Sequence, residues 1–411
     1  TTRLVGSEMC IRDRMNAVLE IPIESMVADD SDAVSTNDYQ AIIDHVIDEV
    51  YEKTKKDARQ LPMKIYTTFD LKVQDVLVKL EKGELFKYYN DYDQEGTAIT
   101  SIEDGSIIAL SGGRKYGARG LNRATDINRQ PGSTAKPLFD YGPGIEYNNW
   151  STYQLFADEP HSYSDGGTVY NANRKYNGLM TMREALKQSR NIPAIKAFQS
   201  LKSTDVLSFV KSLGLNPDMS QGILFETHAI GGYTGESPLT LAAAYAAFSN
   251  GGYYVEPRSF TKIVYRDTDE VYEVKTAPQK VMSEETAYMV SDMLVTSASY
   301  LTGRTSVNGV TYGLKTGTTD YDSATAKAFK LPNNAVNDLW DAAVTPDYSI
   351  AIWYGYEKIN SKYTNKFGSG QNVRLFKAII NGTLSGTKNF TKPDGVVEVT
   401  IEKETNPAML P

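Results

Sequence analysis

The sequence predicts a domain of the α+β class, which contains both helices and β-strands. Residues 39–56 place apolar side chains at helical spacing. Residues 239–248 form an alanine-rich apolar run that is too short to span a membrane, so we expect a core helix. Residues 310–319 are β-branched and interrupted by glycine, which is typical of a strand. The chain has 411 residues, enough for one domain of roughly 320 residues with flanking segments.

The N-terminal segment is expected to lie outside this domain. Residues 8–14 resemble the translation of a transposase end sequence used in preparing DNA sequencing libraries, so we expect residues 1–14 to be an assembly artefact. Residues 15–62 have the character of a linker, in which an acidic run precedes the amphipathic helix at 39–56. The apolar stripe of that helix consists of Ile42, Ile43, Val46, Ile47 and Val50.

The first of three short motifs is Ser133-Thr134-Ala135-Lys136, which has the form S-x-x-K. Pro131-Gly132 is a turn pair and Ser133 is a preferred N-cap residue, so a helix is predicted to begin here; Pro137 is tolerated in its first turn. The spacing of three places Ser133 and Lys136 on one helical face. Lys136 can activate the serine as a nucleophile if burial or a neighbouring cation lowers its pKa. Taken alone, the motif is more often a helix cap with a solvated lysine.

The second motif is Ser189-Arg190-Asn191, of the form S-x-N. It follows residues 181–188, which are predicted to form a short helix. Three polar residues at such a junction usually form a simple turn. The catalytic alternative is that Ser189 relays a proton between Lys136, Lys315 and a leaving amine, and that Asn191 holds a substrate amide through its side chain.

The third motif, Lys315-Thr316-Gly317-Thr318, lies in the predicted strand at 310–319. Gly317 leaves room for another backbone, and a substrate can lie along the strand edge as an added strand. Lys315, Thr316 and Thr318 offer a charge and two hydroxyls to a terminal carboxylate. The backbone N–H groups of Ser133 and Thr318 are the natural pair for an oxyanion hole. The simpler alternative is an edge strand with a surface lysine.

Together the three motifs fit the S-x-x-K, S-x-N and K-T-G signature of the penicillin-recognising serine acyltransferases. Each motif alone is weak evidence, but their order and domain-scale separation are hard to reach by chance. The chain resembles the transpeptidase domain of a class A (bifunctional) penicillin-binding protein over residues 63–386. Further matches to the family are residues 64–70, 112–116, 121–124, 237–245 running to 250–252, and 345–348 followed by 353–356.

The resemblance implies a five-stranded antiparallel sheet flanked by helices, plus an all-helical lobe, with the site between them. The implied enzyme is a serine-type D-Ala-D-Ala transpeptidase that cross-links peptidoglycan stem peptides through a Ser133 acyl-enzyme, is inhibited by β-lactams, and needs neither cofactor nor metal. Its expected partners are stem peptides, β-lactams and the cell-wall synthesis machinery, at the outer face of the cytoplasmic membrane.

The resemblance also implies flanking parts. In the family, the segment corresponding to 15–62 joins a glycosyltransferase domain to the transpeptidase, and we expect that domain and the membrane anchor to be missing from this chain. Residues 396–401 alternate like a strand, so we expect residues 387–411 to begin a further C-terminal module. Two departures from the family lie beside the third motif: a longer stretch between Thr319 and Trp340, and residues 341–344, where an aromatic and a glycine are more usual.

Composition argues against several other classes of function. A net charge of -8 argues against a nucleic-acid surface, and no apolar run approaches the roughly 18 residues of a membrane span. The three histidines, His45, His161 and His228, are scattered and Cys10 is the sole cysteine. Neither a zinc site nor a Ser-His-Asp triad is therefore predicted.

Two alternatives share part of the signature. A DD-carboxypeptidase or β-lactamase has S-x-x-K and K-T-G, but a β-lactamase also needs a base for the deacylating water, and Glu226 and Glu236 lie in no convincing motif. A non-catalytic β-lactam sensor domain would use the same acylation as a signal. The lifetime of the acyl-enzyme separates the β-lactamase from the other two, and transfer to an added amine separates transpeptidase from sensor.

Overall fold

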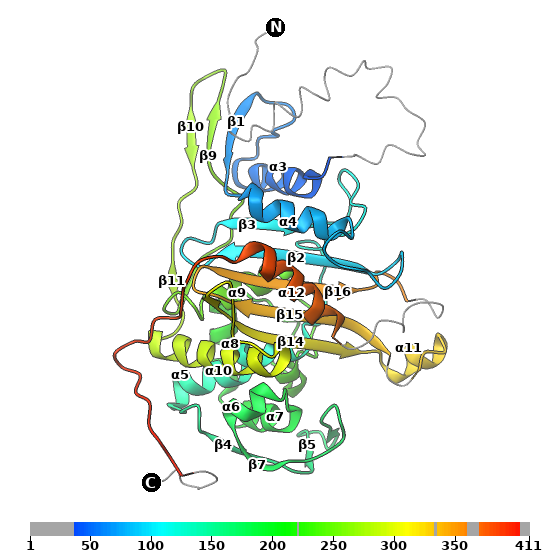
Figure 1. Ribbon diagram of the computed structural model, residues 1–411, viewed down its shortest axis with the longest axis vertical. Helices are drawn as coiled ribbons and strands as arrows, with labels where there is room; N and C mark the ends of the chain where they lie inside the picture. The colour runs from blue at the N-terminus through cyan, green and yellow to red at the C-terminus, as the bar shows by residue number, and fades with distance from the viewer. Residues whose placement is uncertain (1–36, 220–221, 333–334, 360–369, 403–411) are drawn as a thin grey trace.

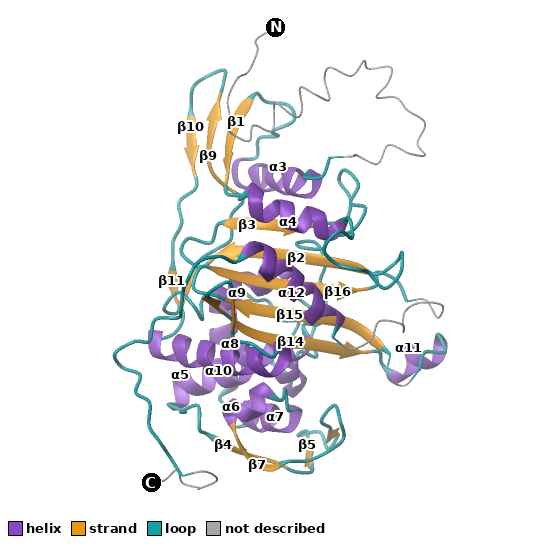
Figure 2. Ribbon diagram, viewed as in Figure 1, coloured by secondary structure: helices purple, strands orange, loops and turns teal. Residues whose placement is uncertain are grey.

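Five antiparallel strands form the centre of the structure, as expected (Figure 1; Figure 2). The computed structural model describes residues 37–219, 222–332, 335–359 and 370–402. The strand order is β14-β15-β16-β2-β3, which makes β14 an edge strand as predicted. The strands are β2 (Gln94–Ser101), β3 (Ile107–Ser111), β14 (Gly313–Asp320), β15 (Val336–Val344) and β16 (Tyr348–Gly355).

The two faces of the sheet are covered by different helices. Side chains of a strand alternate between faces. On β15, Trp340 packs on the side of α9 (Pro238–Ala246), and Leu339 packs on the side of α4 (Leu71–Glu81) and α12 (Gln371–Thr383). The predicted core helix at 239–248 is thus confirmed as α9.

A lobe that is helical in the main adjoins the sheet along β14. Helix α10 (Glu284–Thr302) packs on both β14 and the lobe. The other helical elements are η1 (Gly132–Ala135), η2 (Pro137–Tyr141), α5 (Gly142–Asn148), α6 (Met182–Lys187), α7 (Asn191–Gln199), α8 (Ser203–Ser212) and η3 (Glu226–Ile230). The lobe also carries two small antiparallel pairs, β4 (Leu155–Asp158) with β7 (Gly178–Thr181) and β5 (His161–Ser162) with β6 (Thr168–Val169).

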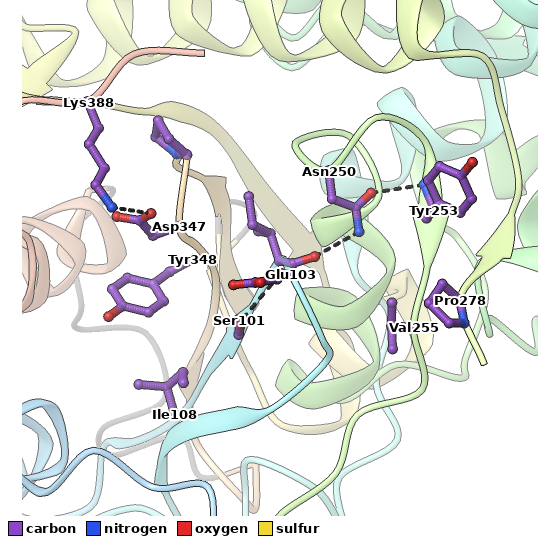
Figure 3. A pocket seen from close by; sticks show the side chains of 12 residues that line it. Ser101, Glu103, Ile108, Asn250, Tyr253, Val255, Pro278, Asp347, Tyr348 and Lys388 are labelled. Atoms are coloured by element: carbon purple, nitrogen blue, oxygen red, sulfur yellow. Dashed lines mark hydrogen bonds and ion pairs between the residues drawn. The ribbon is translucent and has the colours of Figure 1, made fainter. Parts of the chain in front are cut away.

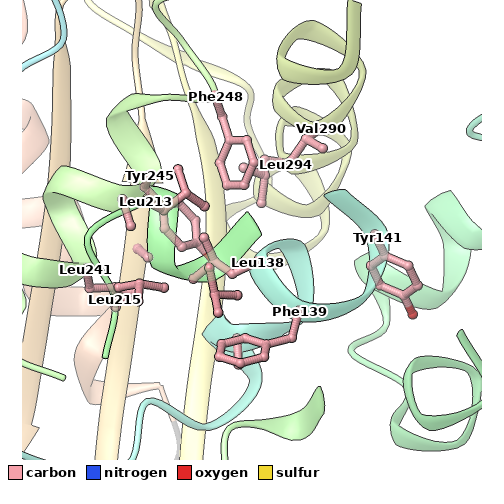
Figure 4. Close-up of a cluster of buried hydrophobic side chains, with 14 of the residues drawn as sticks. Leu138, Phe139, Tyr141, Leu213, Leu215, Leu241, Tyr245, Phe248, Val290 and Leu294 are labelled. Atoms are coloured by element: carbon pink, nitrogen blue, oxygen red, sulfur yellow. The ribbon is translucent and has the colours of Figure 1, made fainter. Parts of the chain in front are cut away.

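One apolar cluster joins the lobe to the sheet side of the molecule. Figure 4 shows part of it, in which side chains from η2, α9 and α10 pack together. The labelled residues are Leu138, Phe139, Tyr141, Leu213, Leu215, Leu241, Tyr245, Phe248, Val290 and Leu294. Because η2 directly follows the first motif, this core holds the turn that carries Ser133 against the sheet.

The predicted N-terminal helix is confirmed as α3 (Gln40–Thr54), and its apolar stripe is buried. It packs on a second, three-stranded sheet of β1 (Met63–Thr67), β9 (Phe260–Tyr265) and β10 (Val271–Glu273). The expected boundary between linker and domain at 62/63 therefore runs through one packed cluster. The division of the chain at this point stays a prediction, and residues 1–14 lie outside the described residues.

Shorter elements complete the described chain. They are the pair β8 (Tyr253–Tyr254) and β11 (Gln279–Lys280), the pair β12 (Ser306–Val307) and β13 (Val310–Thr311), and helix α11 (Ser323–Ala328). The predicted strand at 310–319 forms as β13 and β14, separated at Tyr312. Among the residues described, no helix has the length and apolar character needed to cross a membrane.

The strand predicted at 396–401 is wrong. Residues 389–402 contain no strand, and the Val397 and Val399 side chains are 74% and 56% exposed. Alternation marks a strand when one face is covered and a neighbouring strand accepts its hydrogen bonds, and this segment has neither. Whether residues 387–411 begin a further module stays a prediction.

Candidate active site

Ser133 lies on a tight turn between the lobe and the sheet. The turn η1 begins at Gly132, whose φ of 55° is a conformation that glycine adopts at little cost. The predicted helical start is confirmed, but Pro131, not Ser133, occupies the N-cap position. The Ser133 side chain is half-buried and makes no hydrogen bond with another described residue. Its hydroxyl is therefore not committed to a structural role.

The turn after Lys136 is wider than an α-helix. Residues 137–141 form the π-helix η2, in which the Gly142 N–H donates to the Pro137 carbonyl five residues earlier. Proline has no N–H and its ring crowds the preceding turn of an α-helix, which accounts for the change of helix type at Pro137. Single π turns are frequent at functional sites.

Lys136 is fully buried and its amine faces the second motif. Nζ donates to the Ser189 carbonyl and to Asn191 Oδ1, each at 2.8 Å, and lies 3.4 Å from Ser189 Oγ. The two closer partners are carbonyl oxygens, which can only accept. A neutral amine has two donors and one lone pair, so these partners occupy both donors and leave the lone pair for a hydroxyl proton. This arrangement suits Lys136 to act as a base.

Ser189 connects the two lysines. Its left-handed backbone, with φ of 53°, ends the segment of α6 and turns the chain toward α7. Lys315 Nζ donates to Ser189 Oγ at 2.8 Å and to the Thr316 carbonyl at 2.8 Å. The structure therefore brings Lys136, Ser189, Asn191 and Lys315 together by hydrogen bonds that span all three motifs.

Burial lowers the pKa values of both lysines, and the charge of Lys315 adds to the effect on Lys136. Burial lowers the pKa of Lys136 well below its ordinary value, and the neighbouring charge of Lys315 lowers it further, against the opposing effect of Asp140. Burial also lowers the pKa of Lys315 to about 7, against the opposing effect of Asp341. A lysine must be neutral to accept a proton, so these shifts favour Lys136 as a base.

Two buried carboxyl groups accompany the lysines. Asp140 on η2 is fully buried, both its oxygens lack a hydrogen-bond partner in the described structure, and burial raises its pKa well above the ordinary value. Burial raises the pKa of Asp341 on β15 to about 8, while Asn372 donates to its Oδ1 at 2.8 Å. Sequence reasoning did not single out Asp140, because nothing in an S-x-x-K motif marks the residue four positions later.

Two glycines allow the third motif to lie against the turn that carries Ser133. A Cβ on Gly317 would lie 2.2 Å from the Pro131 carbonyl oxygen. A Cβ on Gly132 would lie 2.7 Å from the Thr318 carbonyl oxygen and 2.9 Å from the Thr318 nitrogen. The close backbone approach predicted for Gly317 is thus confirmed. The backbone of Thr318 lies beside the turn of Ser133, as the expected oxyanion hole requires.

The threonines of the third motif offer unused hydroxyls. Thr318 is exposed and Thr316 half-buried, and neither side chain hydrogen-bonds another described residue. On the neighbouring strand, Trp340 pairs with Gly317 and Asp341 with Thr316, so the unusual residues after Trp340 lie beside this motif. The longer stretch before Trp340 contains α11.

The middle residue of the second motif has a role that sequence reasoning missed. Arg190 is buried and forms an ion pair with Asp158, with Nη2 2.6 Å from Oδ2. The pattern S-x-N leaves this position open, so only the approach of β4 to the motif in three dimensions reveals the pair. The ion pair connects the second motif to strand β4, which ends at Asp158.

Comparison with known proteins places this geometry in a family. The family model described as penicillin binding protein transpeptidase domain matches residues 96–381. The chain belongs to the penicillin-binding protein transpeptidase family. Residues 96–381 span the three motifs and all of the sheet except the start of β2.

Curated relatives agree with this assignment. Penicillin-binding protein 1A/1B of Bacillus subtilis (strain 168) is 38% identical over 382 residues, covering 92% of this chain and 41% of the relative. Penicillin-binding protein 1A of Streptococcus pneumoniae (strain ATCC BAA-255 / R6) is 33% identical over 381 residues, covering 88% of this chain and 52% of the relative. The chain thus spans about half the length of these relatives.

Solved structures share the fold. The structure of PonA1 from Mycobacterium tuberculosis in complex with penicillin V superposes with a TM-score of 0.75 at 20% identity, covering 88% of this chain and 97% of that one. Penicillin-binding protein 1A from Haemophilus influenzae has a TM-score of 0.62 at 21% identity, covering 76% of this chain and 51% of that one.

The two carboxylates considered as a possible base for a β-lactamase make hydrogen bonds with other residues of the domain. Glu226 accepts hydrogen bonds from Ser164 and Gln199, at 2.6–2.7 Å. Glu236 is buried and accepts hydrogen bonds from Tyr233 at 3.0 Å and Thr240 at 2.7 Å. In the described structure neither carboxylate hydrogen-bonds Ser133 or Lys136.

A pocket of about 760 Å³ lies away from the motifs (Figure 3). It is lined from the β2–β3 hairpin, the β15–β16 turn and the segment around β8, and includes the Lys388–Asp347 ion pair at 2.7 Å. Asn250 in this pocket bridges the Ile102 carbonyl and the Tyr253 N–H, each at 2.9 Å. None of the three motifs contributes to its lining.

Proposed function

We propose that this domain is a DD-transpeptidase whose nucleophile is Ser133. The observation that carries the proposal is the hydrogen-bonded line from Lys136 through Ser189 to Lys315, which joins all three motifs next to an uncommitted serine. Both lysines are buried and have lowered pKa values, which suits one as a base and the other as a proton donor.

In the proposed acylation, Ser133 Oγ bonds to the carbonyl carbon of the penultimate D-Ala of a donor stem peptide. Its proton passes to Lys136 Nζ, and the bond to the terminal D-Ala nitrogen breaks. That leaving amine takes the Ser189 hydroxyl proton, which Lys315 replaces. Lys136 then passes its proton through Ser189 to Lys315, so both lysines regain their starting charges. The N–H groups of Ser133 and Thr318 stabilise the oxyanion, while Thr316, Thr318 and Lys315 bind the terminal carboxylate.

In the proposed second step, the amine of an acceptor stem peptide attacks the ester and gives a proton to Lys136. Lys136 returns that proton to Ser133 Oγ as the ester bond breaks, so the serine is released and the peptide cross-link is complete. Asn191 Oδ1 accepts from Lys136, and its Nδ2 donates to the Tyr170 carbonyl. One N–H and one lone pair of this side chain remain to orient the donor amide. The expected partners are stem peptides ending in D-Ala-D-Ala, β-lactams and the cell-wall synthesis machinery, at the outer face of the cytoplasmic membrane. The penicillin V complex of PonA1, a protein of the same fold, supports β-lactam binding.

Acyl-enzyme lifetime and amine transfer test the proposal. Wild-type protein should retain fluorescent penicillin for minutes to hours and should transfer a donor acyl group to an added D-amino acid. Rapid turnover of penicillin would indicate a β-lactamase. Stable labelling without transfer would indicate a sensor domain.

A further inference from the structure

A buried asparagine outside the three motifs hydrogen-bonds the backbone of the second motif. Asn171 lies in the segment between β6 and β7 and is 2% exposed. Its Oδ1 accepts from the Asn191 N–H at 2.9 Å and from the Ile192 N–H at 3.3 Å. Its Nδ2 donates to Asp158 Oδ1 at 2.7 Å and to the Lys175 carbonyl at 3.0 Å. These four bonds use the full capacity of a side-chain amide.

Asn171 caps the N-terminus of helix α7, although it lies about 20 residues before the helix in sequence. The first N–H groups of a helix have no partner within the helix. The N-cap residue of α7 is Arg190, whose side chain has only donors, binds Asp158 and cannot accept from the helix N–H groups. Asn171 supplies the missing acceptor to the first two residues of α7, and the first of these is Asn191 of the second motif. The backbone of Asn191 is therefore set by Asn171.

The same segment also orients the Asn191 side chain. Asn191 Nδ2 donates to the carbonyl of Tyr170, the neighbour of Asn171, at 2.9 Å. This leaves Asn191 Oδ1 facing Lys136 Nζ at 2.8 Å. Residues 170 and 171 thus hold both the backbone and the amide of Asn191 in the position from which it accepts from Lys136.

A buried polar network holds the Asn171 side chain in place. Asp158 is fully buried and accepts from Arg190 Nε at 2.8 Å, from the Asn177 N–H at 3.0 Å and from Asn171. Arg190 also donates to Asn173 Oδ1 at 3.1 Å. A buried network whose members are all satisfied has few alternative arrangements and is rigid.

We propose that Asn171 is a positioning residue for acylation, which holds Asn191 Oδ1 against Lys136 from outside the three motifs. The inference rests on the proposed function, because it concerns the base of that reaction. Lys136 has two fixed acceptors, the Ser189 carbonyl and Asn191 Oδ1, and Asn171 maintains the second. Loss of Asn171 frees the start of α7, so Asn191 Oδ1 no longer holds Lys136 Nζ in place.

A double-mutant cycle on the acylation rate tests this proposal. With fluorescent penicillin as the probe, Asn171→Ala should slow acylation by about tenfold to a hundredfold, and Asn191→Ala by at least as much. Because both substitutions act through the same contact with Lys136, the acylation rate of the double variant should lie within about twofold of the Asn191→Ala rate. A double variant in which the two effects multiply, or an Asn171→Ala rate equal to wild type, would overturn the proposal.

Controls separate positioning from general destabilisation. Asn250→Ala also removes two side-chain hydrogen bonds, in the remote pocket of Figure 3, and should acylate at the wild-type rate. Thermal melts confirm that each variant is folded at the assay temperature, and Asn171→Ser takes the place of Asn171→Ala in the cycle if the latter does not fold. Wild-type protein that penicillin does not label would count against the proposed function and not against the role of Asn171.

Discussion

At the scale of single residues, the site works through buried groups whose charges depend on one another. Lys136 and Lys315 both lie in the interior, where a charged amine is costly, and the positive charge of one disfavours that of the other. Ser189 lies between them and receives a hydrogen bond from Lys315. The protonation state of Lys136 therefore depends on Lys315 although the two are far apart in sequence.

The pH dependence of acylation should reveal this coupling. Acylation requires neutral Lys136, so its rate rises with pH through the pKa of Lys136, and it declines again as Lys315 loses its proton near its pKa of about 7. Lys315→Met removes the charge that lowers the pKa of Lys136, so the rising limb should move to higher pH. The measurement is the acylation rate constant from pH 4 to 10. An unmoved rising limb would show that Lys315 does not tune Lys136.

The two unused hydroxyls of the third motif should act on carboxylate recognition. Thr316→Val and Thr318→Val each remove a hydrogen bond to a charged group, worth roughly 1.5–3 kcal/mol, so each should weaken donor-peptide binding by about ten- to a hundredfold. The control is a donor peptide with its terminal carboxylate amidated, against which both variants should match wild type. Equal impairment with the amidated peptide would assign these threonines another role.

At the scale of elements, the site depends on how closely strand β14 approaches the turn η1. The approach is possible because Gly132 and Gly317 carry no side chains where the two backbones meet. It brings the backbone of Thr318 beside the turn that carries Ser133, and the N–H groups of these two residues are the donors proposed for the oxyanion. Removal of one oxyanion donor typically costs a hundredfold to a thousandfold in rate.

Gly317→Ala tests this packing. Its Cβ would meet the Pro131 carbonyl oxygen at 2.2 Å, so β14 must move away from η1. Acylation should fall by about a hundredfold or more, as expected for a displaced oxyanion donor. Gly117→Ala is the matched control, because a Cβ there meets nothing within 4 Å. If both variants acylate like wild type, the close approach is not needed for the reaction.

Some of these elements could be predicted from the sequence and others could not. Helix α3, helix α9 and the edge strand β14 follow from local periodicity, and the order of the motifs led to the fold through the family resemblance. The Asp158–Arg190 ion pair could not be predicted, because its partners lie 32 residues apart and meet only when β4 packs beside α7. The strand expected at 396–401 failed because alternation does not reveal whether a neighbouring strand is present.

At the scale of the whole molecule, buried acids make stability depend on pH. Burial raises the pKa of Glu236 from 4.5 to about 7, and that of Glu95 likewise to about 7. Between pH 4.5 and 7 the folded chain holds protons on these groups that the unfolded chain has released. The free energy of unfolding therefore falls as pH rises through this window, by about 3 kcal/mol for a single shift of this size.

Glu236→Gln should remove one such contribution. As pH rises from 4 to 8, the difference in the free energy of unfolding between this variant and wild type should change in favour of the variant by up to about 3 kcal/mol. Denaturant unfolding at each pH measures it. Glu226→Gln is the contrasting control: hydrogen bonds from Ser164 and Gln199 lower the pKa of Glu226, so its removal should cost stability above pH 4.5. A Glu236→Gln variant that loses stability as steeply as wild type would show that Glu236 is ionised in the folded protein.

The position of the covalent bond that penicillin forms shows most directly whether Ser133 is the nucleophile. Wild-type protein is labelled with penicillin, digested, and the modified peptide sequenced by mass spectrometry. The adduct should lie on Ser133 alone, and Ser133→Ala should remain folded by thermal melt yet carry no adduct. An adduct on any other residue, or persistent labelling of folded Ser133→Ala, would contradict the assignment of Ser133 as the nucleophile.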